Sequence, residues 1–417
     1  MNLRKLSFRA PPSVIALCGG LALVGGAALA VGLLQSPERA WLNLLLVSYG
    51  LLSLGLGGLV FVALQYITGT GWSVALRRVP EAMAAVLPVA ALGLGIVILA
   101  RPSLYPWAAA PADEAEGLSP LRHAWFNRSF FLARAAFYLA CWLSLGLALV
   151  STSRRQDQDG DPARSRTNVR LSATFLVAFA VTFWLASQDW LMSLDADWSS
   201  TMFAVYQFGG LFLGGLAGIT LLAACLRWMG PLRNVFVGSH VHDLGKLLFG
   251  FSSFWMYLWF CQYMLIWYVN DPEEAVWYTR RLHGGWTPLF FLNVVLNWAV
   301  PFVVLLPRAA KQRAGVLAAV SLVVLAGRWL DLYLQILPRS GGAPLAGAAW
   351  EIGLAAGAAG LFALVFFTAL RRAALVPLGD PLLPESLPAL GLARSPSWAS
   401  RPGSSGPEVS LPRGFLR

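Results

Sequence analysis

The chain is short of charged residues. Only 12% of its 417 residues are Asp, Glu, Lys or Arg, whereas soluble domains carry about 25%. Hydrophobic residues make up 57% of the sequence. This balance excludes an ordinary soluble domain and predicts a protein that crosses a membrane several times. The net charge of +11 does not indicate a nucleic-acid partner, because the basic residues lie in loops between apolar runs, where they orient a protein in the membrane.

Side chains that hold metals and redox groups are also scarce. The four cysteines lie in or at the end of apolar runs, and none forms a CxxC pair, so neither a zinc nor an iron–sulfur site is indicated. The four histidines fall in predicted loops or at helix starts, where they cannot hold a b-type haem or copper at membrane depth: His123, His240, His242 and His283. No Walker, Rossmann or c-type haem motif occurs. We therefore expect that this chain binds no metal and no redox cofactor of its own.

What the sequence has instead is long apolar runs. Each is about long enough to cross a bilayer, and runs of this length are helical, because helices satisfy the backbone in lipid. The predicted fold class is an all-α integral membrane protein with about ten transmembrane helices. The predicted spans are Ser13–Leu34, Trp41–Ile67, Ala82–Ala100, Phe130–Val150, Leu171–Ala186, Met202–Leu226, Leu247–Val269, Thr287–Leu306, Val316–Leu337 and Ala346–Leu370.

The spans divide the chain into three parts. Residues 1–12 are a short N-terminal segment, residues 13–370 form the transmembrane domain, and residues 371–417 are a tail rich in Pro, Ser and Gly. We expect most of this tail to be disordered or bound to a partner. The first apolar run is longer than the core of a usual signal peptide and precedes many more spans, which favours an uncleaved helix.

Basic residues are distributed unequally between the two sets of loops. If the N-terminus is cytoplasmic, the cytoplasmic loops and tail hold roughly three times as many Lys and Arg as the outer loops. The positive-inside rule therefore places both termini in the cytoplasm, which agrees with an even number of spans.

An acidic turn joins the fifth and sixth predicted spans on the outer side. It contains Asp189, Asp195 and Asp197, has no basic residue, and is flanked by Trp190 and Trp198. Trp is typical of the lipid–water interface. Two interpretations are open for the carboxylates: they accept protons at the outer face, or they cap helices at an interface.

Several polar side chains lie inside predicted spans, where a charge costs about 2.5–3.5 kcal/mol on insertion scales. Arg328 and Asp331 are three residues apart in the ninth span and can pair on one helix face. This pair is either a structural brace or a step on a proton or quinone path. Arg134 in the fourth span can reach the outer surface, and Glu351 in the tenth can pair with Arg134 or Arg339.

A second polar group precedes the seventh span on the inner side. His242, Asp243 and Lys246 fall within about one helical turn and can take protons from the cytoplasm. The alternative is a helix cap at Asp243 with ordinary interfacial charges. Farther along the same span, Gln262 and Tyr263 can extend a polar path or line a quinone site among its many aromatic rings.

Several of these motifs resemble one family. The segments are Tyr105-Pro106-Trp107, Asp189-Trp190-Leu191-Met192-Ser193-Leu194-Asp195, Trp198-Ser199-Ser200-Thr201-Met202-Phe203, His242-Asp243-Leu244-Gly245-Lys246-Leu247-Leu248-Phe249, Gln262-Tyr263-Met264-Leu265-Ile266-Trp267-Tyr268, Pro272-Glu273-Glu274, Trp286 and Arg328-Trp329-Leu330-Asp331-Leu332-Tyr333. In this order they resemble the F subunit of bacterial alternative complex III, a quinol:cytochrome c oxidoreductase. The resemblance covers about the middle half of the chain, from Tyr105 to Pro338.

That subunit is similar to the NrfD/polysulfide-reductase membrane anchors. The resemblance implies two four-helix bundles with two peripheral helices, in the bacterial cytoplasmic (inner) membrane. It implies a proton-path and scaffold subunit of the respiratory chain that has no cofactor, with quinone or menaquinol bound here or in a homologous membrane subunit. Other implied partners are an iron–sulfur protein, multihaem cytochromes c that carry haem c, and a terminal oxidase.

The resemblance also selects the functional residues. The proton path would use Asp189, Asp195, His242, Asp243, Lys246, Arg328 and Asp331, with Arg328 and Asp331 as the mid-membrane relay; Arg134, Gln262, Tyr263, Tyr333 and Glu351 would add polar or quinone contacts. Two other functions stay open: a proton-coupled secondary transporter and a purely structural membrane anchor. A transporter is disfavoured because the Gly-rich sixth span has no clear counterpart in the other half of the chain.

Overall fold

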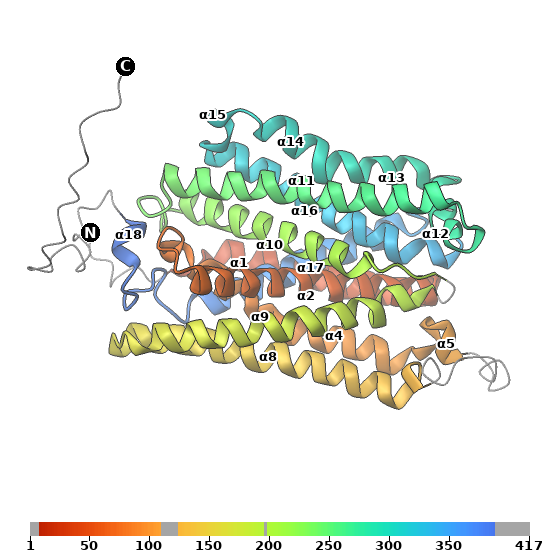
Figure 1. The fold of residues 1–417 in the computed structure, drawn as a ribbon, viewed down its shortest axis with the longest axis horizontal. Helices are drawn as coiled ribbons and strands as arrows, with labels where there is room; N and C mark the ends of the chain where they lie inside the picture. Colours follow the sequence, from red (N-terminus) through yellow and green to blue (C-terminus); the bar gives the residue numbers. More distant parts are fainter. Residues whose placement is uncertain (1–7, 110–123, 196–197, 388–417) are drawn as a thin grey trace, which may run out of the picture.

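The described part of the chain is helical throughout. In the computed structural model, residues 8–109, 124–195 and 198–387 are described, and they contain no β-strand. Nine helical segments among them are long and apolar enough to cross a membrane. They are α1 (Pro12–Gln35), α2 (Pro37–Thr68), the segment Val74–Ala100 with α3 (Arg78–Met83) and α4 (Leu87–Ala100), α8 (Arg128–Asp159), α9 (Ala163–Trp190), α10 (Phe203–Trp228), the segment Trp286–Leu305 with α13 (Trp286–Val294) and α14 (Val300–Leu305), α16 (Ala314–Ile336) and α17 (Ala348–Leu370) (Figure 1).

A tenth long helix matches the remaining predicted span. Helix α11 (Gly238–Val269) runs beside α10 and is as long as α2 and α8 (Figure 1). It is not among the nine most apolar segments; it carries many Trp and Tyr residues, which are common in membrane proteins. The predicted fold class, an all-α membrane protein of about ten helices, is confirmed.

The helices form two bundles and a separate pair. In the first bundle α2, α4, α8 and α9 pack together, and in the second α10, α11, α13–α14 and α16 pack together. One continuous hydrophobic core runs through both bundles. Helices α2 and α10 join the bundles. The two helices can approach closely because glycines face each other: a Cβ at Gly57 would lie only 2.9 Å from the Cα of Gly215. Such small residues permit close helix packing in membranes.

Helices α1 and α17 form the peripheral pair. They run antiparallel, with Gly25 against Gly357 and Cys18 near Gly360. The start of α1 and the end of α17 therefore lie at the same end of the bundles. We call this the inner end and the opposite one the outer end, after the orientation that the charge bias predicts.

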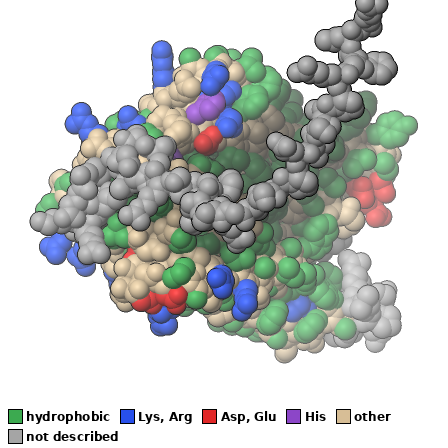
Figure 2. Space-filling view, turned by 60° about the vertical axis from the view of Figure 1, so that its left-hand side comes forward, with side chains coloured by type: hydrophobic (Ala, Val, Ile, Leu, Met, Phe, Trp, Pro, Cys, Tyr) green, Lys and Arg blue, Asp and Glu red, His purple; other side chains and the backbone are tan. Residues whose placement is uncertain are grey.

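The two ends carry different short elements. At the outer end lie α5 (Pro106–Ala109) and α12 (Pro272–Leu282), and at the inner end lie α15 (Arg308–Lys311) and α18 (Leu383–Ser386) (Figure 1). Figure 2 shows basic side chains scattered around the inner end.

The expected tail begins with a segment that packs on the protein itself. Between residues 371 and 387, Asp380 pairs with Arg77, and the Ser386 hydroxyl donates to the backbone of Trp72 at 2.7 Å. The Ser386 hydroxyl also accepts a 3.0 Å bond from the Ala75 amide. The remainder of the tail, 388–417, lies outside the described residues.

Candidate functional site

The centre of the site is the carboxylate of Asp331, which is only 1% exposed within the second bundle. One oxygen accepts a hydrogen bond from the hydroxyl of Tyr206 and another, 2.8 Å long, from the amide of Asn293. The second oxygen accepts a 2.7 Å bond from Gln335 and lies 2.9 Å from the guanidinium of Arg328. The donors come from α10, α13 and α16, so the carboxylate ties three helices of the bundle together.

Arg328 fits beside Asp331 because α10 has glycine opposite it. A Cβ at Gly210 would lie 2.1 Å from the Arg328 Nη2, whereas one at Gly214 would lie 3.6 Å from its Cγ. The Arg328 guanidinium is also 5.8 Å from the ring of Trp255. Although its Nη1 is 2.9 Å from Asp331, this atom makes no well-aligned hydrogen bond. The pair is thus held by charge and proximity more than by a bidentate bond.

The depths of the two charges can be read from α16. The apolar segment that contains α16 and could cross a membrane runs from Ala314 to Ser340. Arg328 lies near the middle of this segment, and Asp331 lies about one turn closer to the outer end.

A short π-helix positions Asn293 for this contact. Residues Val295–Ala299 between α13 and α14 are π-helical, and such bulges are frequent at functional sites. Asn297 in the bulge donates a 2.7 Å bond to the side chain of Asn293, which in turn donates to Asp331. The bulge thus orients the amide that reaches the carboxylate.

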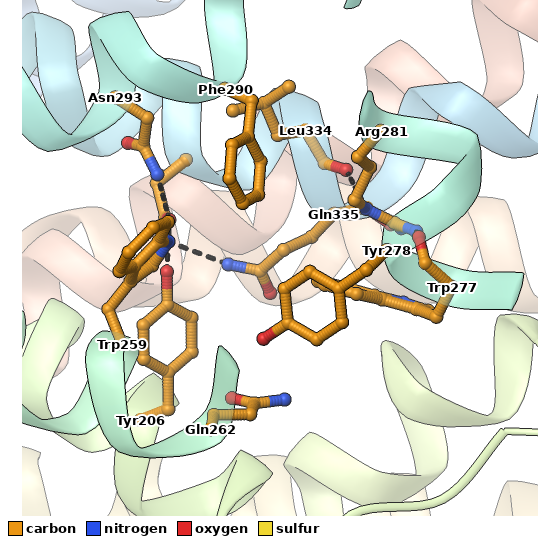
Figure 3. Close-up of a pocket in the computed structure, with 11 residues that line it drawn as sticks. Tyr206, Trp259, Gln262, Trp277, Tyr278, Arg281, Phe290, Asn293, Leu334 and Gln335 are labelled. Atoms are coloured by element: carbon orange, nitrogen blue, oxygen red, sulfur yellow. Dashed lines mark hydrogen bonds between the residues drawn. The ribbon is translucent and has the colours of Figure 1, made fainter. Parts of the chain in front are cut away.

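A small cavity is lined both by Asp331 and by residues of α12, the short helix at the outer end; Figure 3 shows the side chains around it. Its space for water-sized molecules is about 20 Å³, which suffices for one water and not for a six-membered ring. It is lined by Tyr206, Trp259, Gln262, Trp277, Tyr278, Arg281, Phe290, Asn293, Asp331, Leu334 and Gln335. The cavity therefore joins the predicted residues Gln262 and Asp331 with side chains of α12.

Arg281 forms the outer wall of this cavity. It donates to the backbone carbonyls of Leu334, Gln335 and Trp277 at 2.7, 2.9 and 2.5 Å, and it stacks on the Trp277 ring. Burial lowers the pKa of Arg281 to about 9, so the guanidinium remains charged at neutral pH. A cation that caps the last carbonyls of α16 also complements the helix dipole.

Asp195 lies directly outside this wall. Its carboxylate is 3.0 Å from Arg280 and 3.9 Å from Arg281. Burial raises the pKa of the nearby cavity residue Tyr278 well above its ordinary range, so its hydroxyl remains protonated at neutral pH. Polar groups thus extend from Arg328 to the outer loops.

The other acid of the predicted turn, Asp189, is in a different environment. It is 1% exposed and accepts two 2.9 Å bonds from Arg134, one from Tyr138 at 3.1 Å and one from Trp125 at 3.1 Å. Each carboxylate oxygen thus has two donors. This arrangement braces α8 against α9 in the first bundle and leaves no oxygen open at the outer surface. Asp197, the third acid of the turn, lies outside the described residues.

The partner predicted for Glu351 was wrong. Glu351 pairs with Arg39 of α2, and not with Arg134 or Arg339. Tyr333 donates to Glu351 at 2.8 Å and accepts from Arg39 at 2.7 Å. Because partners 312 residues apart in the sequence cannot be paired by spacing, the contact was not predictable. It fastens α17 to α2 and α16 at the outer end.

The inner group of predicted residues is not brought together with Arg328 and Asp331. Lys246 and Asp243 form a 2.7 Å pair at the inner end, with the Lys246 side chain 56% exposed. Between this pair and the Arg328–Asp331 pair, the buried positions of α11 and α16 are apolar except for Ser252 and Ser321. Helix α10 and the π-helical turn add the buried polar residues Thr220 and Asn297. Tyr263 stacks on Trp259 beside the cavity without lining it.

A buried charged cluster at the inner end of the first bundle was missed. Arg78 pairs with Glu81 and Asp157, and Ser153 donates to Glu81 at 2.6 Å. Arg77 and Arg78 fall between the second and third predicted spans, where loop charges are expected, yet both are buried. The spacing of Arg78 and Glu81 was an available signal, because residues three apart on a helix are neighbours.

The described residues contain no group of three or more His, Cys, Asp or Glu side chains that could hold a metal ion. Comparison with known proteins found no matching family model and no matching curated protein.

Proposed function

We propose that the protein is a cofactor-free membrane subunit of a respiratory quinol:cytochrome c oxidoreductase and contributes the outer half of a proton pathway. Nine apolar helices among the described residues indicate a multi-pass membrane protein. The proposal adds that the membrane is the bacterial cytoplasmic membrane and that quinol oxidation takes place in a partner subunit. It rests on the resemblance of the motifs between Tyr105 and Pro338 and on the geometry around Asp331.

The observation that carries the proposal is the position of Asp331. A buried carboxylate inside a membrane bundle is costly, and such residues mark substrate, ion or proton paths. Asp331 is linked on the outer side to a water-sized cavity, to Arg281 and then to Asp195. On the inner side of Arg328, the buried positions are mostly apolar. The polar groups therefore favour a half-channel that opens to the outer face.

The cavity beside Asp331 favours proton transfer over quinone binding at this position. It has room for one water, whereas a quinone head requires space for a substituted ring. Redox chemistry is assigned to partner subunits: a homologous membrane subunit, an iron–sulfur protein and multihaem cytochromes c, with electrons passing on to a terminal oxidase.

Purification from native membranes in a mild detergent tests the complex. The tagged protein should bring with it the absorbance of haem c and the electron paramagnetic resonance signal of reduced iron–sulfur clusters. Isolation of the protein without either signal, under conditions that keep known respiratory complexes intact, would contradict the proposal.

The substitution Asp331→Asn tests the pathway. It keeps the shape of the side chain and removes the charge, so quinol-driven proton release per assembled complex should slow, and the unpaired charge of Arg328 should also lower stability. Asp189→Asn is the matched control, because it makes the same change in the Arg134–Asp189 brace and should lower stability without slowing proton release. Unchanged proton release in Asp331→Asn would leave this residue a structural one.

A purely structural anchor is the second candidate. It is favoured by the two ion pairs that fasten helices at the outer end, Arg134–Asp189 and Arg39–Glu351. This function predicts that Asp331→Asn and Asp189→Asn both act on assembly alone.

A further inference from the structure

We infer that the cavity beside Asp331 is a binding site for one ordered water molecule, held by the side-chain amide of Gln262. The water site stands on the geometry alone. Its role in proton transfer rests on the proposed function.

The first evidence is an unpaired donor. Gln262 is only 3% exposed, and its Nε2 has no hydrogen-bond partner among the described residues. The residue lines the cavity, and Figure 3 shows its amide among the lining side chains, near Tyr278. A buried donor without a partner is rare in proteins, and an ordered water is the usual partner where space is present.

The second evidence is the size of the cavity. About 20 Å³ is available to water-sized molecules, and a single water requires about 10–15 Å³ by this measure. A second water would find little space, and a larger ligand none. The volume therefore selects water over a quinone head or a lipid.

The third evidence is the polarity of the walls. A buried water is stable when it has two to four polar partners. Apart from Gln262, the cavity is lined by Tyr206, Asn293, Asp331 and Gln335 on one side and by Tyr278 and Arg281 on the other. The aromatic rings of Trp259, Trp277 and Phe290 complete most of the lining.

These walls give the water a position between the buried carboxylate and the outer loops. Arg281 is fixed by three backbone carbonyls, so the outer wall does not depend on a mobile side chain. In the proposed pathway, a proton leaves the carboxyl group of Asp331 for the water and then passes to the outer side. Gln262 does not carry the proton. It is a positioning residue, which holds the oxygen of the water in place.

Experimental density provides the direct test. A structure of the purified full-length protein, at a resolution that shows other buried waters, should contain one peak within hydrogen-bond distance of Gln262 Nε2. The peak should be absent in Gln262→Leu. A dry cavity in the wild-type protein would overturn the inference.

Hydroxyl-radical footprinting by X-ray radiolysis gives an independent test, because bound internal waters promote modification of adjacent side chains. Tyr278 should be modified several-fold faster than Tyr138, which is also buried but lies outside the cavity lining. Gln262→Leu should reduce the rate at Tyr278 and leave the rate at Tyr138 unchanged. Gln262→Met repeats the test with an unbranched apolar chain if Gln262→Leu does not fold. Equal rates at the two tyrosines in the wild-type protein would contradict the inference.

The proton role has its own readout. If both proposals hold, Gln262→Leu slows quinol-driven proton release several-fold without changing the haem c content of the complex. If the water is present and proton release is unchanged in Gln262→Leu, the water site stands and its role in the pathway fails. If no haem c co-purifies, the proposed function fails while the density test remains valid.

Discussion

The hydroxyl of Ser252 donates a 2.6 Å hydrogen bond to the backbone carbonyl of Asn297. This bond joins α11 to the π-helical turn of the α13–α14 segment. In a regular helix the carbonyl of Asn297 would accept from residue 301, but that residue is proline and has no N–H. In lipid, a freed carbonyl needs another donor, and Ser252 provides it.

Ser252→Ala should therefore lower the free energy of unfolding by about 1–3 kcal/mol, because it leaves a buried carbonyl without this donor. Denaturant titration in detergent measures the change. Ser253→Ala is the matched control: Ser253 donates within its own helix to the carbonyl of Phe249, so its loss should have little effect. In a Pro301→Ala background, where an N–H is restored, Ser252→Ala should cost less. Equal costs in both backgrounds would mean that Pro301 and Ser252 are not linked.

Gly210→Ala should displace the guanidinium of Arg328. The new Cβ would lie 2.1 Å from Nη2, so either Arg328 or α10 must move, at a cost of about 1–3 kcal/mol. Gly214→Ala, one turn away, would place its Cβ at an ordinary 3.6 Å from Arg328. Thermal unfolding of the two variants should show a clearly lower midpoint for Gly210→Ala alone. Similar midpoints would indicate that the guanidinium has free space elsewhere.

Asp331→Ala should destabilise the protein by about 3–5 kcal/mol, because Arg328 would remain buried without its counter-charge. Arg328→Met alone should also be destabilising. The double variant removes both charges and should recover much of the loss, which a double-mutant cycle measures as a coupling free energy. Additive costs would show that the two residues are stabilised by separate partners.

Arg281→Lys should destabilise the outer end by about 1–3 kcal/mol. A lysine ammonium cannot reproduce the planar fork with which Arg281 reaches three carbonyls, nor its stacking on Trp277. The neighbouring Arg280→Lys serves as the control, because the Arg280 side chain is 48% exposed and forms a single ion pair, with Asp195. Limited proteolysis at α12 should increase for Arg281→Lys and not for Arg280→Lys.

Hydropathy predicted the helices well, because each span must satisfy its own backbone in lipid and so appears as one apolar run. Helix ends were less predictable. Helix α8 continues to Asp159 and α9 begins at Ala163, well beyond their apolar runs, because polar helices can extend into water where hydropathy gives no signal. The contacts of the tail segment 371–387 could not be predicted for another reason. Asp380 and Ser386 contact Arg77 and its neighbours, which only the fold brings close to the tail.

For the site, local spacing was informative and long-range pairing was not. Arg328 and Asp331 are three residues apart, so helix geometry predicted their contact. Arg134 was predicted as a polar residue, but Asp189, its partner, is 55 positions away. Tyr206 and Asn293 were not singled out, since one tyrosine or asparagine in an apolar run is common. The spacing of Asn293, Asn297 and Pro301 was the signal that could have indicated the π-helix.

The pairing of α1 with α17 has a consequence for biogenesis. Helix α1 makes its most extensive contacts with α17. Gly25 lies so close to Gly357 that a Cβ added to Gly25 would be 2.6 Å from the Cα of Gly357. The ribosome delivers α1 long before α17. Until α17 has been synthesised, the glycine-bearing face of α1 therefore contacts lipid or the insertion machinery. Closure of this helix pair is thus a late event in assembly, and a chain that stalls before α17 would present an unpaired α1 to membrane quality control.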